Sequence, residues 1–331
     1  GTDLLKGIIK NIREEIIRLG GEVRFSTKLE DINYKDKHLQ SIKLSNGEIL
    51  DCETLVLAIG HSARDTFELL YEKELNIEAK SFAVGLRVQH PQNMINISQY
   101  GKEAADVLPT ASYKLTTKSS AARGVYSFCM CPGGYVVNAS TEKGGLAING
   151  MSYHDRKSES ANSAIIVTVD AKEFADETPL AGMYLQRELE SKCYKAGNSY
   201  IPVQLLGDFI KGRESMKFGE TKPCFKGKYT FSRLDKVLPD FIVSALKEAF
   251  AAFDKKIEGF AREDAILAAI ESRTSSPIRI VRDENLEASI RGIYPCGEGA
   301  GYAGGISSAA MDGLKVAEAI ISKYNSSLIN S

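Results

Sequence analysis

The 331-residue sequence predicts an α/β plus α+β fold: an incomplete doubly wound, Rossmann-like domain with a large, mainly antiparallel domain inserted into it. Two observations predict the doubly wound part. Near the start, a helix, a short meander and a buried strand follow one another. At the end, a strand runs into a glycine-rich turn and a helix. We therefore expect residues 1–78 and 289–331 to form one partial domain, with residues 79–288 as the insert.

The opening elements can be placed from local patterns. Apolar residues recur at helical spacing after Thr2, an N-cap, until a glycine pair stops the helix. The segment "EVRFST" (22–27) follows as a strand, and alternating segments then flank Asn46-Gly47, a typical two-residue hairpin turn. The segment "TLVLAIG" (54–60) is continuously apolar and ends in glycine, as a buried parallel strand would.

The middle of the chain has a different character. Segments rich in β-branched and aromatic residues predict strands, namely "SFAVGLRVQH", "GVYSFCMCPGG", "YVVNAST", "GLAINGMS" and "SAIIVTVD". Helical periodicity appears in "LAGMYLQRELESKCYKAG" and "DFIVSALKEAFAAFDKKI". Strands followed by helices in this proportion predict an inserted domain of the kind that binds substrate.

Composition and charge limit the classes of partner. The net charge is −1, from 42 basic and 43 acidic residues, so no basic excess attracts nucleic acid or an anionic membrane. No apolar run is long enough to span a bilayer. The six cysteines form neither a disulfide framework nor a zinc site. We expect a cytoplasmic protein with reduced thiols and no metal.

The stretch "GEGAGYAGG" (297–305) matches a dinucleotide fingerprint at Gly299, Gly301 and Gly304. A true fingerprint opens a βαβ unit whose helix leads to a second strand. Only 27 residues follow Gly304, and none of them forms a strand-like segment. The pattern therefore fails its context test, and a turn that only packs a helix onto a strand remains an alternative.

The same stretch fits the other glycine-rich site of an FAD-binding domain better. There, Gly297-Glu298 would end a strand, and the carboxylate would accept hydrogen bonds from the ribityl hydroxyls of the flavin. Close approach of the cofactor requires glycine in the backbone. The following helix begins at Gly304, Gly305 and Ile306, and its free N–H groups would face phosphate or the flavin edge. Gly60, at the end of the buried strand, would lie near the same cofactor.

Further polar residues are candidates for the pocket. Arg273, Thr274 and Ser275, with Ser276, follow a segment that we expect to be helical, and they form a loop rich in donors. Helix termination with solvated side chains is the alternative.

Cysteine and histidine side chains are weaker candidates for a redox or catalytic role. The pair Cys129 and Cys131 could exchange electrons with a flavin, although free cysteines are more often small buried hydrophobes. His61, His90 and His154 have no partner visible in the sequence, so packed or surface histidines are the simpler interpretation. The catalytic residue is therefore not assigned.

The chain resembles a family of bacterial FAD-dependent oxidoreductases, described as dehydrogenases, of the glutathione-reductase-like FAD superfamily. The matching segments run from "TLVLAIGHSARDTFELL" through "SFAVGLRVQHPQNMINISQYG", "YSFCMCPGGYVVNAS", "NGMSYHDRKSESANSAIIV" and "ESRTSSPIRI" to "GIYPCGEGAGYAGGISSAAMDG". The family implies a longer chain that begins with an amino-terminal extension and a true GxGxxG unit. This sequence resembles the carboxyl-terminal portion, which lacks the unit that holds the ADP end of FAD.

The resemblance implies an oxidoreductase that transfers electrons or hydride through FAD to or from a small molecule, with NAD(P)H as a possible partner. On this interpretation, the stretch alone would bind FAD weakly and be inactive. An FAD-dependent enzyme of similar fold that modifies RNA is an alternative, which the neutral charge disfavours. A non-enzymatic nucleotide-binding or interaction module is another.

Overall fold

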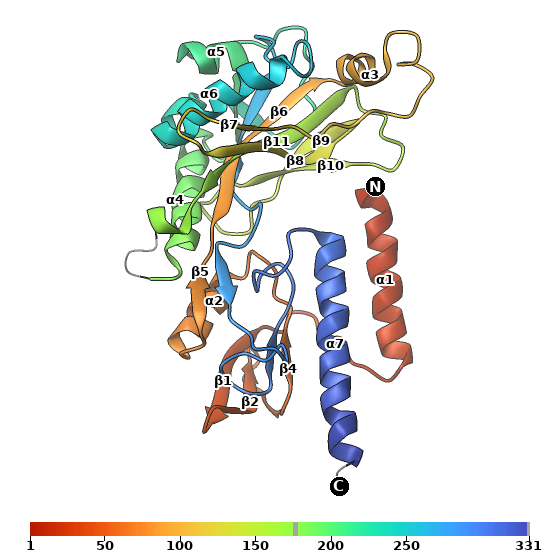
Figure 1. The fold of residues 1–331 in the computed structure, drawn as a ribbon, viewed down its shortest axis with the longest axis vertical. Coiled ribbons are helices and arrows are strands. Elements are labelled where there is room, and N and C mark those ends of the chain that lie inside the picture. Colours follow the sequence, from red (N-terminus) through yellow and green to blue (C-terminus); the bar gives the residue numbers. More distant parts are fainter. Residues whose placement is uncertain (175–177, 330–331) are drawn as a thin grey trace. The chain divides into compact units, whose positions relative to one another are not determined.

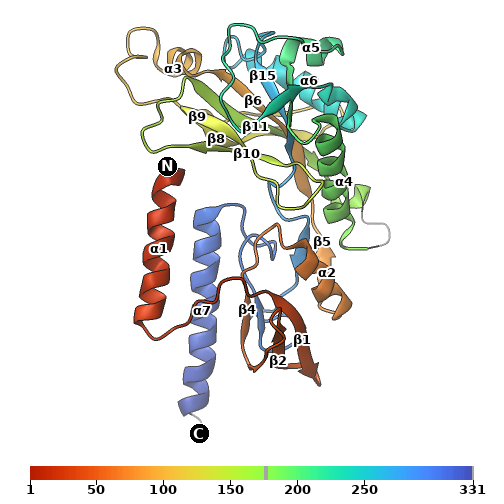
Figure 2. The same cartoon turned by 180° about the vertical axis from the view of Figure 1, so that it is seen from behind.

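The computed structural model describes residues 1–174 and 178–329, with side chains up to residue 325 (Figures 1 and 2). The chain forms two compact units. The large unit contains residues 1–22, 83–169 and 186–272, and the small unit contains residues 23–82, 170–185 and 273–331. The division expected from the sequence, at residues 78/79 and 288/289, stays a prediction about domain organisation.

A seven-stranded sheet is the centre of the large unit, with strand order β14-β12-β15-β6-β11-β8-β7. β12 and β15, β15 and β6, β11 and β8, and β7 and β8 pair antiparallel, whereas β12 and β14 pair in parallel. The expectation of a large, mainly antiparallel sheet is therefore confirmed. Its strands are β6 (Phe82–Pro91), β7 (Thr116–Lys118), β8 (Gly124–Cys131), β11 (Ser160–Val169), β12 (Ile201–Leu205), β14 (Tyr229–Phe231) and β15 (Ile266–Glu271).

Helices and a second, three-stranded sheet cover the large sheet (Figure 1). Helix α6 packs on it through a buried apolar face that includes Leu246, Phe250 and Phe253. This face follows from the helical spacing of its apolar residues. The other elements of the large unit are α1 (Thr2–Arg18), α3 (Gln92–Tyr100), α4 (Ala181–Ala196) from residue 186 onward, α5 (Leu206–Lys211), α6 (Asp240–Asp254), β9 (Gly134–Asn138), β10 (Ile148–Ser152), β13 (Phe225–Lys226) and the 3₁₀ turn Leu234–Lys236. The start of α4 and the 3₁₀ turn Ala171–Glu173 belong to the small unit.

The large unit buries one complete ion pair. Arg87 donates from Nε and Nη2 to the two carboxylate oxygens of Glu271, at 2.9 and 3.0 Å. Its Nη1 donates to Oδ1 of Asn162 at 2.9 Å and to the carbonyl of Cys129 at 3.0 Å. Gly150 lies against this guanidinium, where a Cβ would overlap it. These contacts satisfy a charge that would otherwise be costly to bury.

The small unit is built from short strands and two helices. The antiparallel meander β1 (Leu29–Lys35), β2 (His38–Leu44) and β3 (Ile49–Asp51) is joined by the predicted turn at Asn46-Gly47. Two further pairs follow: β4 (Leu55–Leu57) with β17 (Ile293–Pro295), and β5 (Ile77–Ala79) with β16 (Ile278–Ile280). The helices are α2 (Arg64–Glu72) and α7 (Ile306–Ile329).

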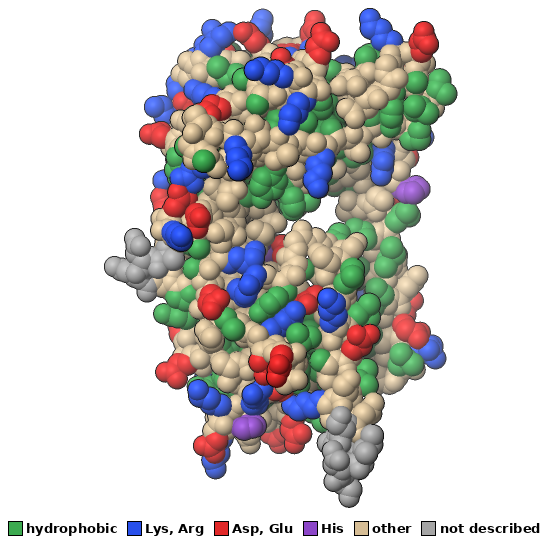
Figure 3. Space-filling model, in the orientation of Figure 1, with side chains coloured by type: hydrophobic (Ala, Val, Ile, Leu, Met, Phe, Trp, Pro, Cys, Tyr) green, Lys and Arg blue, Asp and Glu red, His purple; other side chains and the backbone are tan. Residues whose placement is uncertain are grey.

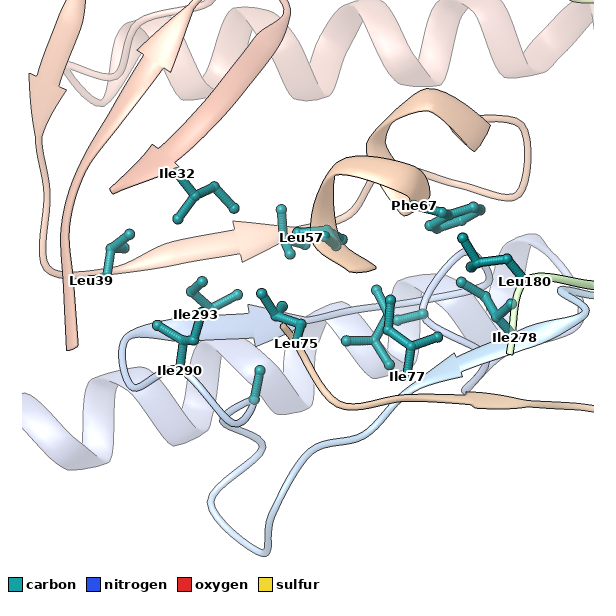
Figure 4. Close-up of a cluster of buried hydrophobic side chains, with 14 of the residues drawn as sticks. Ile32, Leu39, Leu57, Phe67, Leu75, Ile77, Leu180, Ile278, Ile290 and Ile293 are labelled. Atoms are coloured by element: carbon teal, nitrogen blue, oxygen red, sulfur yellow. The ribbon is translucent and has the colours of Figure 1, made fainter. Parts of the chain in front are cut away.

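One apolar cluster holds the small unit together (Figure 4). Leu57 of β4 and Ile293 of β17 lie in it, beside Phe67 of α2. The segment before α4 contributes Leu180 to the same cluster. All four side chains are at most 1 % exposed, so the short strands are fixed mainly by this packing.

Two strand predictions in the small unit need correction. Residues 22–27 form no strand, because no neighbouring strand among the described residues pairs with them. Phe25 is 70 % exposed and Ser26 has a φ of 54°, which a strand does not allow. The segment 54–60 pairs only over Leu55–Leu57, and Val56 is 44 % exposed.

Candidate functional site

The carboxyl ends of two parallel strands meet in the small unit. Ile293 pairs with Leu55 and Pro295 with Leu57, and the backbone N–H of Cys296 donates to the carbonyl of Leu57 at 3.0 Å. The strands predicted from "TLVLAIG" and "RGIYPC" therefore share one sheet, as expected. In open sheets, ligands collect beyond this edge. The loops that leave it begin at Gly60 and Gly297.

These two loops are in direct contact. A Cβ on Gly299 would overlap the carbonyl oxygen of Gly60, so residue 299 must be glycine for the backbones to approach this closely. Gly60 and Gly297 have φ values of 71° and 76°, in the left-handed region that favours glycine. The glycines predicted at this site thus have a local backbone reason for their identity.

A third loop, residues 273–276, joins the first two. Arg273 donates from Nη1 to Oγ of Ser62 at 2.7 Å. The buried hydroxyl of Ser276 donates to the carbonyl of Gly299 at 3.1 Å. Thr274 is buried and Ser275 half-buried in the same turn. The loop predicted as a pocket element therefore lies with the glycine-rich stretch, although it follows the strand β15 and not a helix.

Glu298 follows Gly297 directly in the second of these loops. Its Oε1 lies 3.4 Å from Nδ1 of His61, whose ring is buried, while the Glu298 side chain is 30 % exposed. Lys80 belongs to the same electrostatic environment. Burial lowers the pKa of the Lys80 amine, repulsion from Arg279 lowers it further, and Glu298 acts in the opposite direction.

Two residues that the sequence did not single out hold the loop in place. Asp312, on α7, accepts the backbone N–H of Gly297 at 2.8 Å. It also receives two hydrogen bonds from Arg282, at 2.7 and 3.0 Å. Arg282 in turn donates to the carbonyl of Pro295 at 3.0 Å. No sequence pattern singled out either residue.

The start of α7 is open where the glycine pair precedes it. A Cβ on Gly304 would meet no atom within 4 Å, and one on Gly305 would reach only Oγ of Ser308. The Ile306 side chain is 71 % exposed. The first backbone N–H groups of a helix have no partner within that helix. The backbone N–H of Gly304 donates to Oγ of Ser308 at 3.3 Å, and the glycine pair leaves open space at the start of α7.

The cysteines and other histidines singled out from the sequence belong to the large unit. His90 is fully buried, its Nε2 lies 2.8 Å from the carbonyl of Phe260, and burial lowers its pKa to about 4. The backbone N–H of His154 donates to Asp3. Both Cys129 and Cys131 are free thiols, and burial raises the pKa of Cys131. These contacts assign structural positions to His90 and His154.

The described part of the chain contains neither an evident metal site nor a helix that could span a membrane. No group of three or more His, Cys, Asp or Glu residues there could hold a metal ion. No helix among those residues is long and apolar enough to cross a bilayer. On the face in Figure 3, basic and acidic side chains are interspersed.

Fold and site together define a mixed α/β protein with a large antiparallel sheet and a glycine-rich loop site at the end of a parallel strand pair. Residues 81–274 match a family described as "FAD-dependent protein, C-terminal domain-like". Because this match covers more than half of the chain, the protein belongs to that FAD-dependent family, and FAD is its cofactor.

A bacterial relative is similar along almost the whole chain. It is an "Uncharacterized protein" from Clostridium beijerinckii, 56 % identical over 330 residues, covering 98 % of this chain and 62 % of the relative. The chain thus spans less than two thirds of the length of the relative it matches.

Two solved structures of PqsL from Pseudomonas aeruginosa are also similar. A mutant of PqsL covers 80 % of this chain and 64 % of its own, at 13 % identity and a TM-score of 0.26. The other, titled a probable FAD-dependent monooxygenase, covers 72 % and 58 %, at 12 % identity and a TM-score of 0.21. Similarity at these TM-scores and identities does not establish a shared fold or function.

Proposed function

We propose that the small unit binds the flavin end of FAD in an oxidoreductase of the dehydrogenase type. The observation that carries the proposal is the convergence of three loops, at Gly60, Arg273 and Gly297, on the carboxyl end of one parallel strand pair. This is where an open sheet places a dinucleotide cofactor. Family membership names that cofactor as FAD.

Each group in the site has a separate task under this proposal. Glu298 accepts hydrogen bonds from ribityl hydroxyls, because its carboxylate is accessible and carries acceptors only. Gly304, Gly305 and Ile306 present the backbone donors of the α7 start to the cofactor. Gly301, with Gly297 and Gly299, shapes the preceding turn. The φ of Gly301 is 87° and a Cβ there would lie 2.6 Å from the carbonyl of Ile278.

Bound flavin supplies two-electron or hydride transfer, and the protein supplies binding, orientation and electrostatics. Lys80 and Arg279 place positive charge in the small unit, where Lys80 interacts with Glu298. Burial lowers the pKa of the Lys80 amine, and repulsion from Arg279 lowers it further. A small-molecule substrate, with NAD(P)H as electron donor or acceptor, fits this role better than nucleic acid or a membrane.

The ADP end of FAD requires a second set of contacts. We propose that residues outside this stretch, in the 38 % of a chain as long as the Clostridium relative that this sequence does not cover, hold the pyrophosphate and ribose. The small unit, which includes residues 289–331, would then be one part of a Rossmann-like domain. The 331-residue stretch alone would bind FAD weakly, and the six free cysteines favour a cytoplasmic location.

Flavin absorbance tests the function. We expect the protein expressed from its complete coding sequence to purify with stoichiometric FAD and to bleach when NADH or NADPH is added anaerobically. A protein that binds FAD but is reduced by neither nucleotide would be an oxidoreductase with another donor. Absence of any FAD binding would overturn the assignment and favour a non-enzymatic module.

A further inference from the structure

The large unit contains a cavity that the flavin site does not use. Its volume is about 560 Å³, within the usual range for small-molecule pockets. It lies between the end of α4, the loop after α5 and the segment that follows β14. The lining residues that carry the argument below are Lys195, Lys236, Glu214, Met216, Phe231 and Arg233.

The charge around this cavity is unequal. Lys192 is paired with Glu188 at 2.6 Å, and Arg233 donates to Asp235 at 2.7 Å. Among the described residues, neither Lys195 nor Lys236 has an ion pair. Lys236 interacts with the Asp235 carboxylate without forming an ion pair, and the two ammonium groups on the cavity wall can still donate to an anion. Each can donate up to three hydrogen bonds to phosphate oxygens.

The other wall of the cavity is apolar. Phe231 lines it, and the ring of Phe231 lies 4.8 Å from that of Phe218, centroid to centroid. Met216 is 82 % exposed at the same cavity, although a methionine side chain gains by leaving water. Methionine adapts its shape to a flat ring and makes favourable contacts with it. An aromatic wall beside ammonium groups suits a ligand that carries both a ring and a phosphate.

Two features oppose an anion here. The Glu214 carboxylate lines the same cavity, where it interacts with the Arg233 guanidinium, and the end of helix α4 is the second. Helix α4 ends at Ala196, and the carbonyl end of a helix repels negative charge by about 0.3–1 kcal/mol. The hydroxyl of Ser232 donates to the carbonyl of Ala196 at 3.0 Å, which satisfies one of these acceptors. Hydrogen bonds from charged donors contribute about 1.5–3 kcal/mol each. Two such bonds exceed the repulsion from the helix end.

We propose that this cavity binds a nucleoside phosphate, with the phosphate at Lys195 and Lys236 and the base between Met216 and Phe231. The site is independent of the proposed flavin site, because all its lining residues belong to the large unit. A bound nucleotide there would regulate the protein or act as a second substrate.

Calorimetric titration of the 331-residue chain with ADP, adenosine and pyrophosphate tests the proposal. We expect ADP to bind more tightly than either part, and 1 M salt to weaken ADP and pyrophosphate more than adenosine. The double variant Lys195→Gln/Lys236→Gln should weaken ADP binding at least about tenfold. Lys255→Gln, an exposed lysine outside the cavity, is the matched control and should change nothing.

If the double variant does not fold, a second measurement on the unaltered protein still tests the proposal. Methyl NMR should show the Met216 signal shift on addition of ADP, while Met311, also exposed but in the small unit, stays in place. Because FAD also contains ADP, Gly304→Val is included, and its ADP affinity should equal that of wild type. No ADP binding, an unmoved Met216 signal, or equal loss in Lys255→Gln would overturn the proposal.

Discussion

The backbone N–H of Gly297 donates a 2.8 Å hydrogen bond to Oδ2 of Asp312, fifteen residues further along the chain. This bond ties the end of β17 to α7, and Arg282 holds the other face of the same carboxylate. Glu298 follows Gly297 directly. The position of Glu298 therefore depends on Asp312, a residue within α7 that has no predicted contact with the cofactor.

Asp312→Asn is expected to destabilise the small unit by roughly 2–4 kcal/mol, since it removes one partner of a buried ion pair. The hydrogen bond from Arg282 lowers the pKa of Asp312, so the carboxylate stabilises the fold above the unfolded value of about 3.9. This contribution disappears as pH falls through the lower folded value. Urea unfolding from pH 7 to pH 2 should show that acid dependence in wild type and lose it in the variant.

Glu287 offers a second test of acid stability. Burial alone would raise the pKa of Glu287, but hydrogen bonds from Lys323, Tyr294 and Arg291 outweigh it and lower the value to about 2. The folded state therefore gains roughly 2–3 kcal/mol above pH 5, which is lost between about pH 5 and pH 2. Glu287→Gln should remove this gain, and thermal unfolding at pH 7 and pH 3 should reveal it. Equal stability loss at both pH values would contradict the ion-pair explanation.

The large-unit strands could be predicted from sequence because alternation and β-branched content are local signals. The segments that became β6, β8 and β11 were placed within a few residues. Residues 22–27 have the same local composition, yet no strand lies beside them in the described structure. A strand exists only where another pairs with it, and pairing is a property of the whole chain.

The same difference between local signals and long-range contacts applies to the candidate site. Gly60 and Gly299 could be singled out because glycine positions report backbone geometry directly, and Glu298 because it lies between two such glycines. Their role in binding the cofactor stays a prediction. Asp312 and Arg282 could not be found, since their spacing in sequence follows from how α7 packs on β17. Lys80 was missed for the same reason: its pKa depends on burial and on Arg279, which only the folded chain brings near.

The two glycines Gly299 and Gly304 should respond differently to a side chain. Gly299→Ala would place Cβ against the Gly60 carbonyl, so it should lower the melting temperature and the FAD affinity together. Gly304→Val meets open space and should fold normally, yet largely abolish FAD binding by filling the cofactor's place. Differential scanning fluorimetry and FAD titration of the complete protein measure the two effects. Normal FAD affinity in Gly304→Val would reduce the loop to a packing turn.

Glu298→Gln isolates the proposed contact with the cofactor. The amide keeps the shape of the side chain but weakens charge-assisted hydrogen bonds, so FAD binding should lose roughly 1–2 kcal/mol, or about 5- to 30-fold in Kd. Because the ribityl hydroxyls are uncharged in either redox state, oxidised and reduced FAD should lose the same factor, and the midpoint potential should stay nearly constant. Glu284→Gln, an exposed carboxylate of the same unit, is the control and should bind as wild type. Titration and spectroelectrochemistry of the complete protein decide the matter. If the shift in midpoint potential, expressed as a free energy, exceeds the loss in free energy of FAD binding, Glu298 lies beside the flavin ring instead of the ribityl chain.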